Sequence, residues 1–121
     1  MIRWSLVLVA SGLFTGAATA STAGGDPKAG SALFQDRCAI CHAIGGGQGP
    51  SLKGVIGRKA ASVEGFTYTP PLKASGLTWT AATLEVFLTN PAKAVPGTAM
   101  PIRVNDPKQR ADLIAYLATN R

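Results

Sequence analysis

Cys38, Cys41 and His42 stand within five residues, in the order Cys-Ala-Ile-Cys-His. Thiols three positions apart on a helix share a face, so both can bond to the vinyl groups along one edge of a porphyrin. An imidazole that follows directly can then ligate the iron. This spacing is the c-type haem attachment pattern. It predicts one covalent haem, with Cys38 and Cys41 as its attachment points and His42 as a metal ligand.

Three other chemistries use the same residue types. A structural zinc site needs four Cys or His ligands, and the sequence offers only these three. A thioredoxin-like redox pair belongs to a βαβ unit, whereas the glycine-rich stretch 45–50 that follows does not read as a buried strand. A structural disulfide would leave His42 without a role. Haem attachment is therefore the preferred interpretation.

A second axial ligand decides whether a haem carries electrons or leaves an open site for a gas or a peroxide. His42 is the only histidine in the sequence, so a second histidine ligand from the same chain is excluded. Met100 is the one methionine besides Met1, and it stands in a loop rich in proline and glycine. A loop methionine can also simply fill a gap in the core. We expect Met100 to be the second metal ligand.

The N-terminus has the composition of an export signal. Arg3 precedes an apolar run over residues 4–13, and Ala18-Thr19-Ala20 provides small residues for cleavage. Cleavage is predicted after Ala20, with Ala23 ending a second possible site. The apolar run is shorter than a bilayer requires, so a retained anchor is the less favoured alternative. The predicted organisation is a signal peptide over residues 1–20 and one domain over residues 21–121, exported to the periplasm.

Charge favours protein partners over nucleic acid. The sequence carries a formal charge of +6, and a moderately basic surface attracts acidic partners and raises encounter rates. The charge could also serve solubility alone. No run of lysine or arginine alternates with aromatic residues, which excludes nucleic acid as an expected partner.

The elements that must position these residues are helices. Asp26-Pro27 and Asp106-Pro107 both combine an N-cap aspartate with a proline at the first helical position. The predicted helices run from Pro27 into the haem motif, from Thr69-Pro70 to Gly76, from Thr80 to Asn90-Pro91, and from Pro107 to about Thr119. Long loops over residues 43–69 and 92–104 separate them. Loops of this length in a small domain usually carry function. The fold class is all-α.

The motifs, taken together, resemble class I cytochromes c of the mitochondrial type and their bacterial relatives. The similarity runs from Gly25 to Arg121 and rests on the haem motif and on the segments 49–52, 57–59, 65–69, 76–79, 90–91, 96–100 and 112–117. It implies a small helical globule whose N- and C-terminal helices cross and whose loops wrap one haem. Gly30 and Phe34 match the crossing point, opposite Tyr116.

The resemblance also implies roles for residues around the haem. Pro50 would accept a hydrogen bond from His42 through its carbonyl, which fixes the ring and raises its donor strength. Arg58, Tyr68, Trp79 and Thr98 match positions near the haem propionates, where a buried carboxylate needs donors. Tyr68 and Trp79 could equally be ordinary core residues, and both roles can coexist. The expected set of cofactor-binding residues is Cys38, Cys41, Pro50, Leu52, Arg58, Tyr68, Trp79, Leu88 and Thr98.

Some positions depart from the mitochondrial pattern. Phe87 replaces a tyrosine, Leu72 an asparagine and Ile102 a phenylalanine, which suggests a more apolar distal side. The ring of lysines around the exposed haem edge is thinned. Arg37 and Lys93 match it, whereas lysines are usual in place of Ala92 and Ala99.

The expected function is that of a non-enzymatic, monomeric one-electron carrier that contacts membranes only through its partners. Its donor would be a cytochrome bc complex or a dehydrogenase, and its acceptor a terminal oxidase or a photosynthetic reaction centre. A haem enzyme or gas sensor with an open sixth site is one alternative. A dedicated electron-transfer subunit of one periplasmic dehydrogenase is another.

Overall fold

The computed structural model describes residues 24–43 and 47–121. Within them every regular element is a helix, and extended backbone pairs in a single isolated bridge, between Lys59 and Thr78. The all-α prediction is confirmed. None of the described helices is both long and apolar enough to cross a membrane. The predicted signal peptide and both predicted cleavage sites lie outside the described residues.

The two terminal helices begin with the same N-terminal cap. Helix α1 covers Pro27–Arg37 and helix α6 covers Pro107–Thr119. In each, the preceding aspartate, Asp26 or Asp106, accepts a hydrogen bond from the backbone N–H two residues on, at 2.9 and 2.8 Å. Both helices have proline at their first position, where no N–H partner is needed. The Asp-Pro pairs therefore start these helices as predicted.

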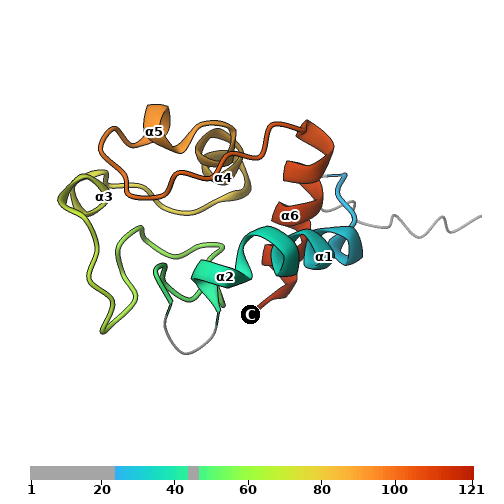
Figure 1. Ribbon diagram of the computed structural model, residues 1–121, viewed down its shortest axis with the longest axis horizontal. Coiled ribbons are helices and arrows are strands. Elements are labelled where there is room, and N and C mark those ends of the chain that lie inside the picture. The colour runs from blue at the N-terminus through green and yellow to red at the C-terminus, as the bar shows by residue number, and fades with distance from the viewer. Residues whose placement is uncertain (1–23, 44–46) are drawn as a thin grey trace, which may run out of the picture.

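Helices α1 and α6 cross in close contact (Figure 1). Gly30 is buried at the crossing, where a Cβ would overlap the Asp112 carbonyl oxygen and lie 2.8 Å from the Cβ of Tyr116. The rings of Phe34 and Tyr116 pack beside it with centroids 5.4 Å apart. Glycine lets the two backbones approach more closely than any side chain would allow. The predicted crossing is confirmed.

The first helix does not continue unbroken into the haem motif, which corrects the prediction. Helix α2 covers Ala39–His42 and is separated from α1 by Cys38, whose backbone departs from helical geometry at φ −111°. The Cys38 N–H still bonds to the Phe34 carbonyl, and the His42 N–H bonds to the Cys38 carbonyl. Helix α2, which carries the motif, is thus bonded to the end of α1, but its axis does not have to continue the axis of α1.

Three further helices follow the haem motif and precede α6. They are α3 (Pro70–Ala74), α4 (Ala81–Thr89) and the single turn α5 (Pro91–Ala94). Asn90-Pro91 was expected only to end a helix, and α5 was not predicted. The expectation failed because a proline that stops one helix can also open the next, and the Asn90 side chain caps α5.

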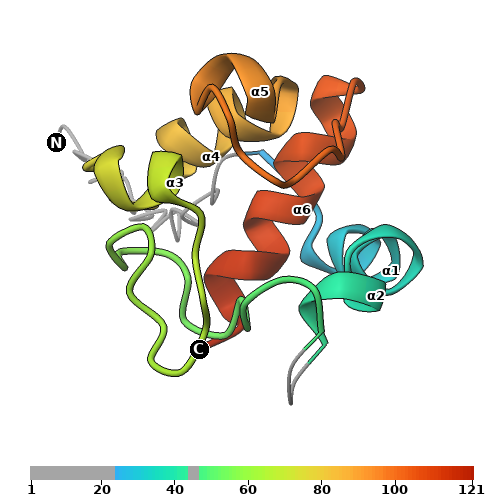
Figure 2. The ribbon, with the colours of Figure 1, turned by 60° about the vertical axis from the view of Figure 1, so that its left-hand side comes forward.

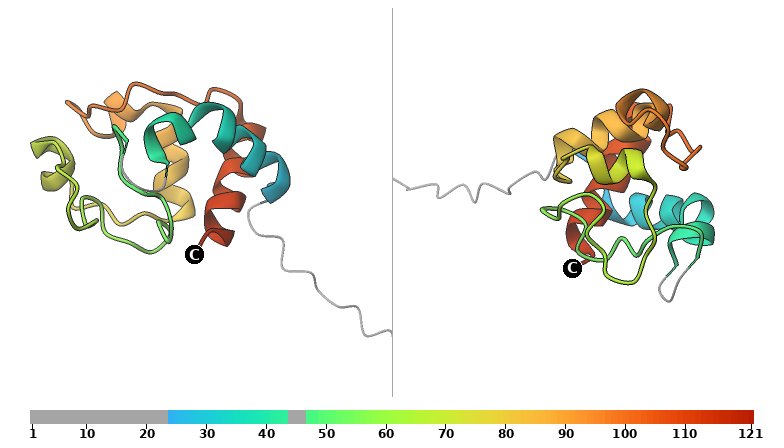
Figure 3. Two further views of the ribbon diagram at one scale, coloured as in Figure 1. Left: turned by 60° about the horizontal axis from the view of Figure 1, so that its bottom comes forward. Right: turned by 90° about the vertical axis from the view of Figure 1, so that its left-hand side faces the viewer.

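Helix α6 lies between α1 and α4 (Figures 2 and 3). The irregular segments 47–69 and 95–106 run along opposite sides of the molecule. Side chains from α4, α6 and these segments form the core. Its most deeply buried apolar members include Val55, Val95, Val104 and Leu113. The core surrounds a cavity, which holds the predicted site.

Candidate haem-binding site

A cavity of about 420 Å³ lies between the helices and the two irregular segments. That volume is within the range of small-molecule and cofactor sites. Every residue expected to bind the cofactor or its metal lines it: Cys38, Cys41, His42, Pro50, Leu52, Arg58, Tyr68, Trp79, Leu88, Thr98 and Met100. The structure therefore brings the complete predicted set together, while their roles toward a ligand stay predictions.

His42 is held in one orientation by the segment that follows it. Its Nδ1 lies 2.7 Å from the carbonyl oxygen of Pro50. A carbonyl oxygen can only accept, so Nδ1 carries the proton and donates, which leaves the Nε2 lone pair available to a metal. The expected bond to Pro50 is present.

Gly49 packs directly on the imidazole of His42. A Cβ at this position would lie 2.6 Å from Cε1 and 2.7 Å from Nδ1. The Gly49 N–H also bonds to the Cys41 carbonyl at 2.9 Å. The absence of a side chain thus lets the segment close over the ring. This role of Gly49 was not predicted. The only signal for it in the sequence is that Gly49 directly precedes Pro50.

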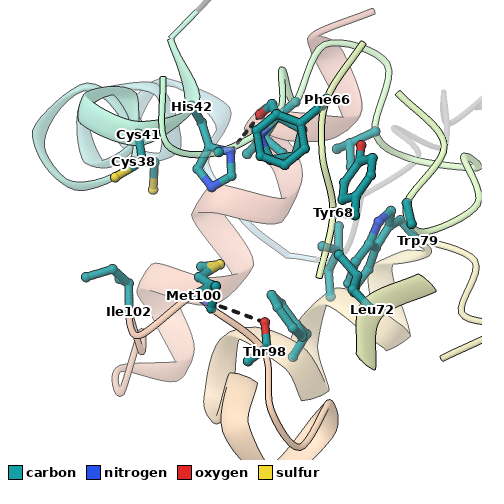
Figure 4. Close-up of a pocket in the computed structure, with 18 of the residues that line it drawn as sticks. Cys38, Cys41, His42, Phe66, Tyr68, Leu72, Trp79, Thr98, Met100 and Ile102 are labelled. Atoms are coloured by element: carbon teal, nitrogen blue, oxygen red, sulfur yellow. Dashed lines mark hydrogen bonds between the residues drawn. The ribbon is translucent and has the colours of Figure 1, made fainter. Parts of the chain in front are cut away.

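The two cysteines are free thiols at the edge of the cavity. Figure 4 shows both sulfur atoms on the same side, next to His42. Burial raises the pKa of the Cys38 thiol, although the positive charge of Arg37 partly opposes this. Cys38 is therefore a protonated thiol at neutral pH. The two side chains share a face, as their spacing predicts.

Met100 approaches the cavity from the wall opposite His42. Figure 4 shows the Met100 thioether and the His42 imidazole pointing toward each other across the cavity. The loop before Met100 is organised by a turn in which the Thr98 N–H bonds to the Val95 carbonyl at 3.0 Å. The Met100 N–H then donates to the Thr98 hydroxyl oxygen at 3.4 Å. A thioether and an imidazole facing each other are a suitable pair of axial haem ligands.

Two hydroxyl groups on the cavity wall keep a proton to donate. The Tyr68 hydroxyl oxygen accepts from the Val63 N–H at 3.0 Å, and the Thr98 oxygen accepts from Met100. Both oxygens act as acceptors in these bonds, so both O–H groups can still donate to a ligand. Both groups are therefore able to donate to the haem propionates, and that role stays a prediction.

Arg58 and Trp79 also lie on this wall, but they differ in how they are held. The two terminal nitrogens of Arg58 donate to the carbonyls of Ser51 and Lys53, each at 2.9 Å. Arg58 therefore organises the segment after Pro50 as well as bringing a positive charge to the cavity. The Trp79 ring packs edge-on against Phe87 with centroids 5.0 Å apart.

Phe66 lines the cavity but was not among the predicted site residues. Its ring packs edge-on against Tyr68, with centroids 4.8 Å apart. The two residues stand two positions apart in a segment without helical structure, and such residues point to the same side of an extended chain. This spacing could have identified Phe66.

The residues that depart from the mitochondrial pattern also lie on the cavity. Leu72, Phe87 and Ile102 all contribute to its lining. Figure 4 shows Ile102 near Met100 and the cysteines, and Leu72 beside Trp79. Each adds an apolar surface to the cavity. A Met100 side that is more apolar than in mitochondrial relatives stays a prediction.

A model of the family described as Cytochrome c matches residues 27–121. The chain belongs to the cytochrome c family. The matched region includes all residues of the cavity, and the family resemblance seen in the sequence is confirmed.

Relatives within the cytochrome c family include the following three proteins. The chain is 47% identical over 102 residues to cytochrome c2 of Rhodomicrobium vannielii, which covers 80% of this chain and 81% of that protein. It is 47% identical over 98 residues to cytochrome c of Stellaria longipes, covering 77% and 91% of the two chains. Among solved structures, cytochrome cH from Methylobacterium extorquens is 44% identical in sequence and has a TM-score of 0.73. The match covers 78% of this chain and 99% of that chain.

Proposed function

We propose that this chain is a one-electron carrier with a single covalent haem c. Cys38 and Cys41 would form the thioether links, and His42 and Met100 would be the axial ligands. The observation that carries the proposal is the arrangement of the His42 imidazole and the Met100 thioether on opposite walls of one cavity, beside two free thiols. Membership in the cytochrome c family supports it.

The side chains present fit such a group. Thiols, an imidazole with a free Nε2 lone pair and a thioether are the donor types that haem c takes. The remaining lining is largely apolar, with Leu52, Val55, Leu88 and Leu113 among its members. When bound, haem supplies a single iron that changes between ferrous and ferric states. Apolar walls exclude water from it, which limits side reactions.

The ligands would favour transfer of an electron over binding of a substrate. A neutral thioether stabilises ferrous iron relative to ferric iron and raises the potential. His42 is held by Pro50, and Met100 stands in a loop organised by Thr98. Ligands that are fixed in this way need little rearrangement when the charge on the metal changes, so the electron moves readily.

The polar wall would hold the haem propionates. Tyr68 and Thr98 would donate their free O–H groups, and Trp79 its indole N–H. An ionised carboxylate in a partly apolar site needs such donors, because without them it would take up a proton. The guanidinium group of Arg58 would add an opposite charge nearby.

The proposed location is the periplasm, to which the predicted signal peptide over residues 1–20 would direct the chain. The carrier would take electrons from a cytochrome bc complex or a dehydrogenase and pass them to a terminal oxidase or a reaction centre. It would act as a monomer and meet the membrane only through these partners. A basic surface that attracts acidic partners is consistent with this role.

Spectroscopy and mass spectrometry of the purified holoprotein test the proposal. Its mass should include one covalent haem, and its N-terminus should begin after Ala20 or Ala23. The ferric protein should show the weak sulfur-to-iron absorption band, and Met100→Ala should remove that band. If the band is absent and the ferrous protein binds carbon monoxide readily at neutral pH, the site is open and the carrier function is wrong.

A further inference from the structure

The segment from Met100 to Asn105 has no regular secondary structure, yet it carries a proposed axial ligand. Its attachments come from helices on either side. The Val104 N–H bonds to the Leu88 carbonyl at 2.9 Å, and Arg37 donates to the Arg103 carbonyl at 3.0 Å. The position of Met100 therefore depends on contacts made a few residues further along the chain.

Arg110 provides a further attachment, through a buried side chain. Its residue exposure is only 8%. One terminal nitrogen, Nη1, donates to the carbonyl oxygens of Val104 at 2.8 Å and of Asn105 at 3.0 Å. Hydrogen bonds from a charged group are stronger than those between neutral groups. A single guanidinium group on α6 thus fixes two consecutive carbonyls of the segment that follows Met100.

Glu85 fixes Arg110 in turn. The Arg110 Nε donates to the Glu85 Oε1 at 2.6 Å, and the two side chains are 10% and 43% exposed. A buried guanidinium group is favourable only when its charge is compensated and its donors are satisfied. Glu85 supplies this compensation from α4, which also carries the cavity residues Phe87 and Leu88.

We propose that the Glu85–Arg110 ion pair is a latch that sets how readily Met100 leaves the haem iron. Both are positioning residues, since neither lines the cavity. With the pair intact, the carbonyls of Val104 and Asn105 are held and the segment keeps Met100 on its wall. Without Glu85, Arg110 loses its charged partner and the segment is freer to move. The inference rests on the proposed function, because it takes Met100 as an axial ligand.

Imidazole is a suitable probe, because it competes with Met100 for ferric iron. We expect its apparent affinity for the ferric holoprotein to rise roughly tenfold in Glu85→Ala, because the substitution removes one charge-assisted hydrogen bond. The rise should be smaller in Glu85→Gln, whose amide oxygen can still accept from Arg110. Amide hydrogen exchange at Val104 should also become faster, more so in Glu85→Ala than in Glu85→Gln.

Lys108→Gln is the matched control. It breaks the other ion pair of α6, with Asp112 at 2.7 Å, but touches no atom of the Met100 segment among the hydrogen bonds described. Its imidazole affinity should equal that of the wild type. Equal affinity in Glu85→Ala and wild type, or an equal rise in the control, would overturn the latch.

The same samples separate this inference from the proposed function. A wild-type ferric protein without the sulfur-to-iron band would refute ligation by Met100, and the inference with it. A wild-type protein with the band, combined with unchanged imidazole affinity and unchanged Val104 exchange in both Glu85 variants, would refute the latch alone.

Discussion

The Nδ1 atom of His42 lies 2.7 Å from the carbonyl oxygen of Pro50, and this contact assigns the two ring nitrogens different tasks. Nδ1 donates to the protein, and the Nε2 lone pair is left available to a metal. Such a bond raises the basicity of a ligating imidazole. The glycine before Pro50 allows it, because Gly49 packs against the ring with no side chain between them.

Gly49→Ala should disturb His42, the proposed iron ligand. The added Cβ would lie 2.6 Å from the His42 Cε1, so the ring or the segment must move and the bond to Pro50 weakens. A less basic imidazole stabilises ferric iron less, which raises the midpoint potential. We expect tens of mV, since about 59 mV corresponds to a tenfold change in a one-electron equilibrium. A redox titration measures it, with Lys53→Gln as the control on the exposed side of the same segment.

Phe87→Tyr should raise the midpoint potential. Phe87 is buried on the cavity that Met100 also lines, and a hydroxyl group there can donate to the thioether sulfur. This draws electron density from the sulfur and favours ferrous iron. We expect a shift below about 59 mV, less than tenfold in the redox equilibrium. Phe34→Tyr adds the same hydroxyl group at the helix crossing and should leave the potential unchanged. Identical titrations of wild type and Phe87→Tyr would reject the prediction.

Gly30→Ala should destabilise the fold strongly. Its Cβ would overlap the Asp112 carbonyl oxygen at the crossing of α1 and α6, and backbone atoms cannot move aside as a flexible side chain can. Overpacking of this kind costs about 1–3 kcal/mol, and we expect the upper end. Denaturant unfolding of the holoprotein measures the change. Ala32→Ser, on the exposed part of the same helix, should change the free energy of unfolding much less.

Asp112 should make stability depend on pH in the acid range. The Asp26 N–H at 2.8 Å and the Lys108 ammonium group at 2.7 Å lower the pKa of its carboxyl group. A carboxyl group whose pKa is lower in the folded state stabilises the fold above its ordinary pKa. That contribution is lost as the pH falls through the folded-state value.

The thermal midpoint measured between pH 7 and pH 3 should therefore fall less in Asp112→Asn than in wild type, with the variant less stable at pH 7. Asp36→Asn, an exposed residue of α1, should keep the wild-type pH dependence. An unchanged slope in Asp112→Asn would show that this carboxylate does not contribute.

Docking to an acidic redox partner should depend only weakly on salt. Alanines stand at positions 92 and 99, where lysines are usual in mitochondrial relatives, and surface charges are screened beyond about 8 Å at physiological ionic strength. Stopped-flow electron transfer to a purified terminal oxidase should therefore slow gently as salt is added. The double variant Ala92→Lys/Ala99→Lys should show a steeper decline. A wild-type rate that falls as steeply as that of the double variant would contradict this expectation.

Local signals in the sequence predicted the parts of this molecule that depend on neighbours in the chain. The Asp-Pro starts of α1 and α6 are short-range caps, and the pattern from Cys38 to His42 specifies its chemistry by spacing alone. Met100 followed from the lack of any other candidate. These residues converge on the cavity as predicted.

The features that were missed depend on groups far apart in the sequence. Glu85 and Arg110 are 25 positions apart, and nothing in either local sequence reveals that they pair. The turn α5 was missed for a local reason instead, because the proline that ends one helix also opens the next and Asn90 caps it. The close contact of Gly49 with the His42 ring exists only after the segment has folded back.

The crossing of α1 and α6 also has a consequence for how the molecule assembles. The hydrogen bond from the Asp26 N–H to Asp112 joins residues 86 positions apart, so the terminal helices close one loop around the whole cavity. Closing a long loop costs more entropy than closing a short one, although the cost grows only with the logarithm of length. Removal of either terminal helix would break this hydrogen bond and open the loop that contains both the Cys38–His42 motif and Met100.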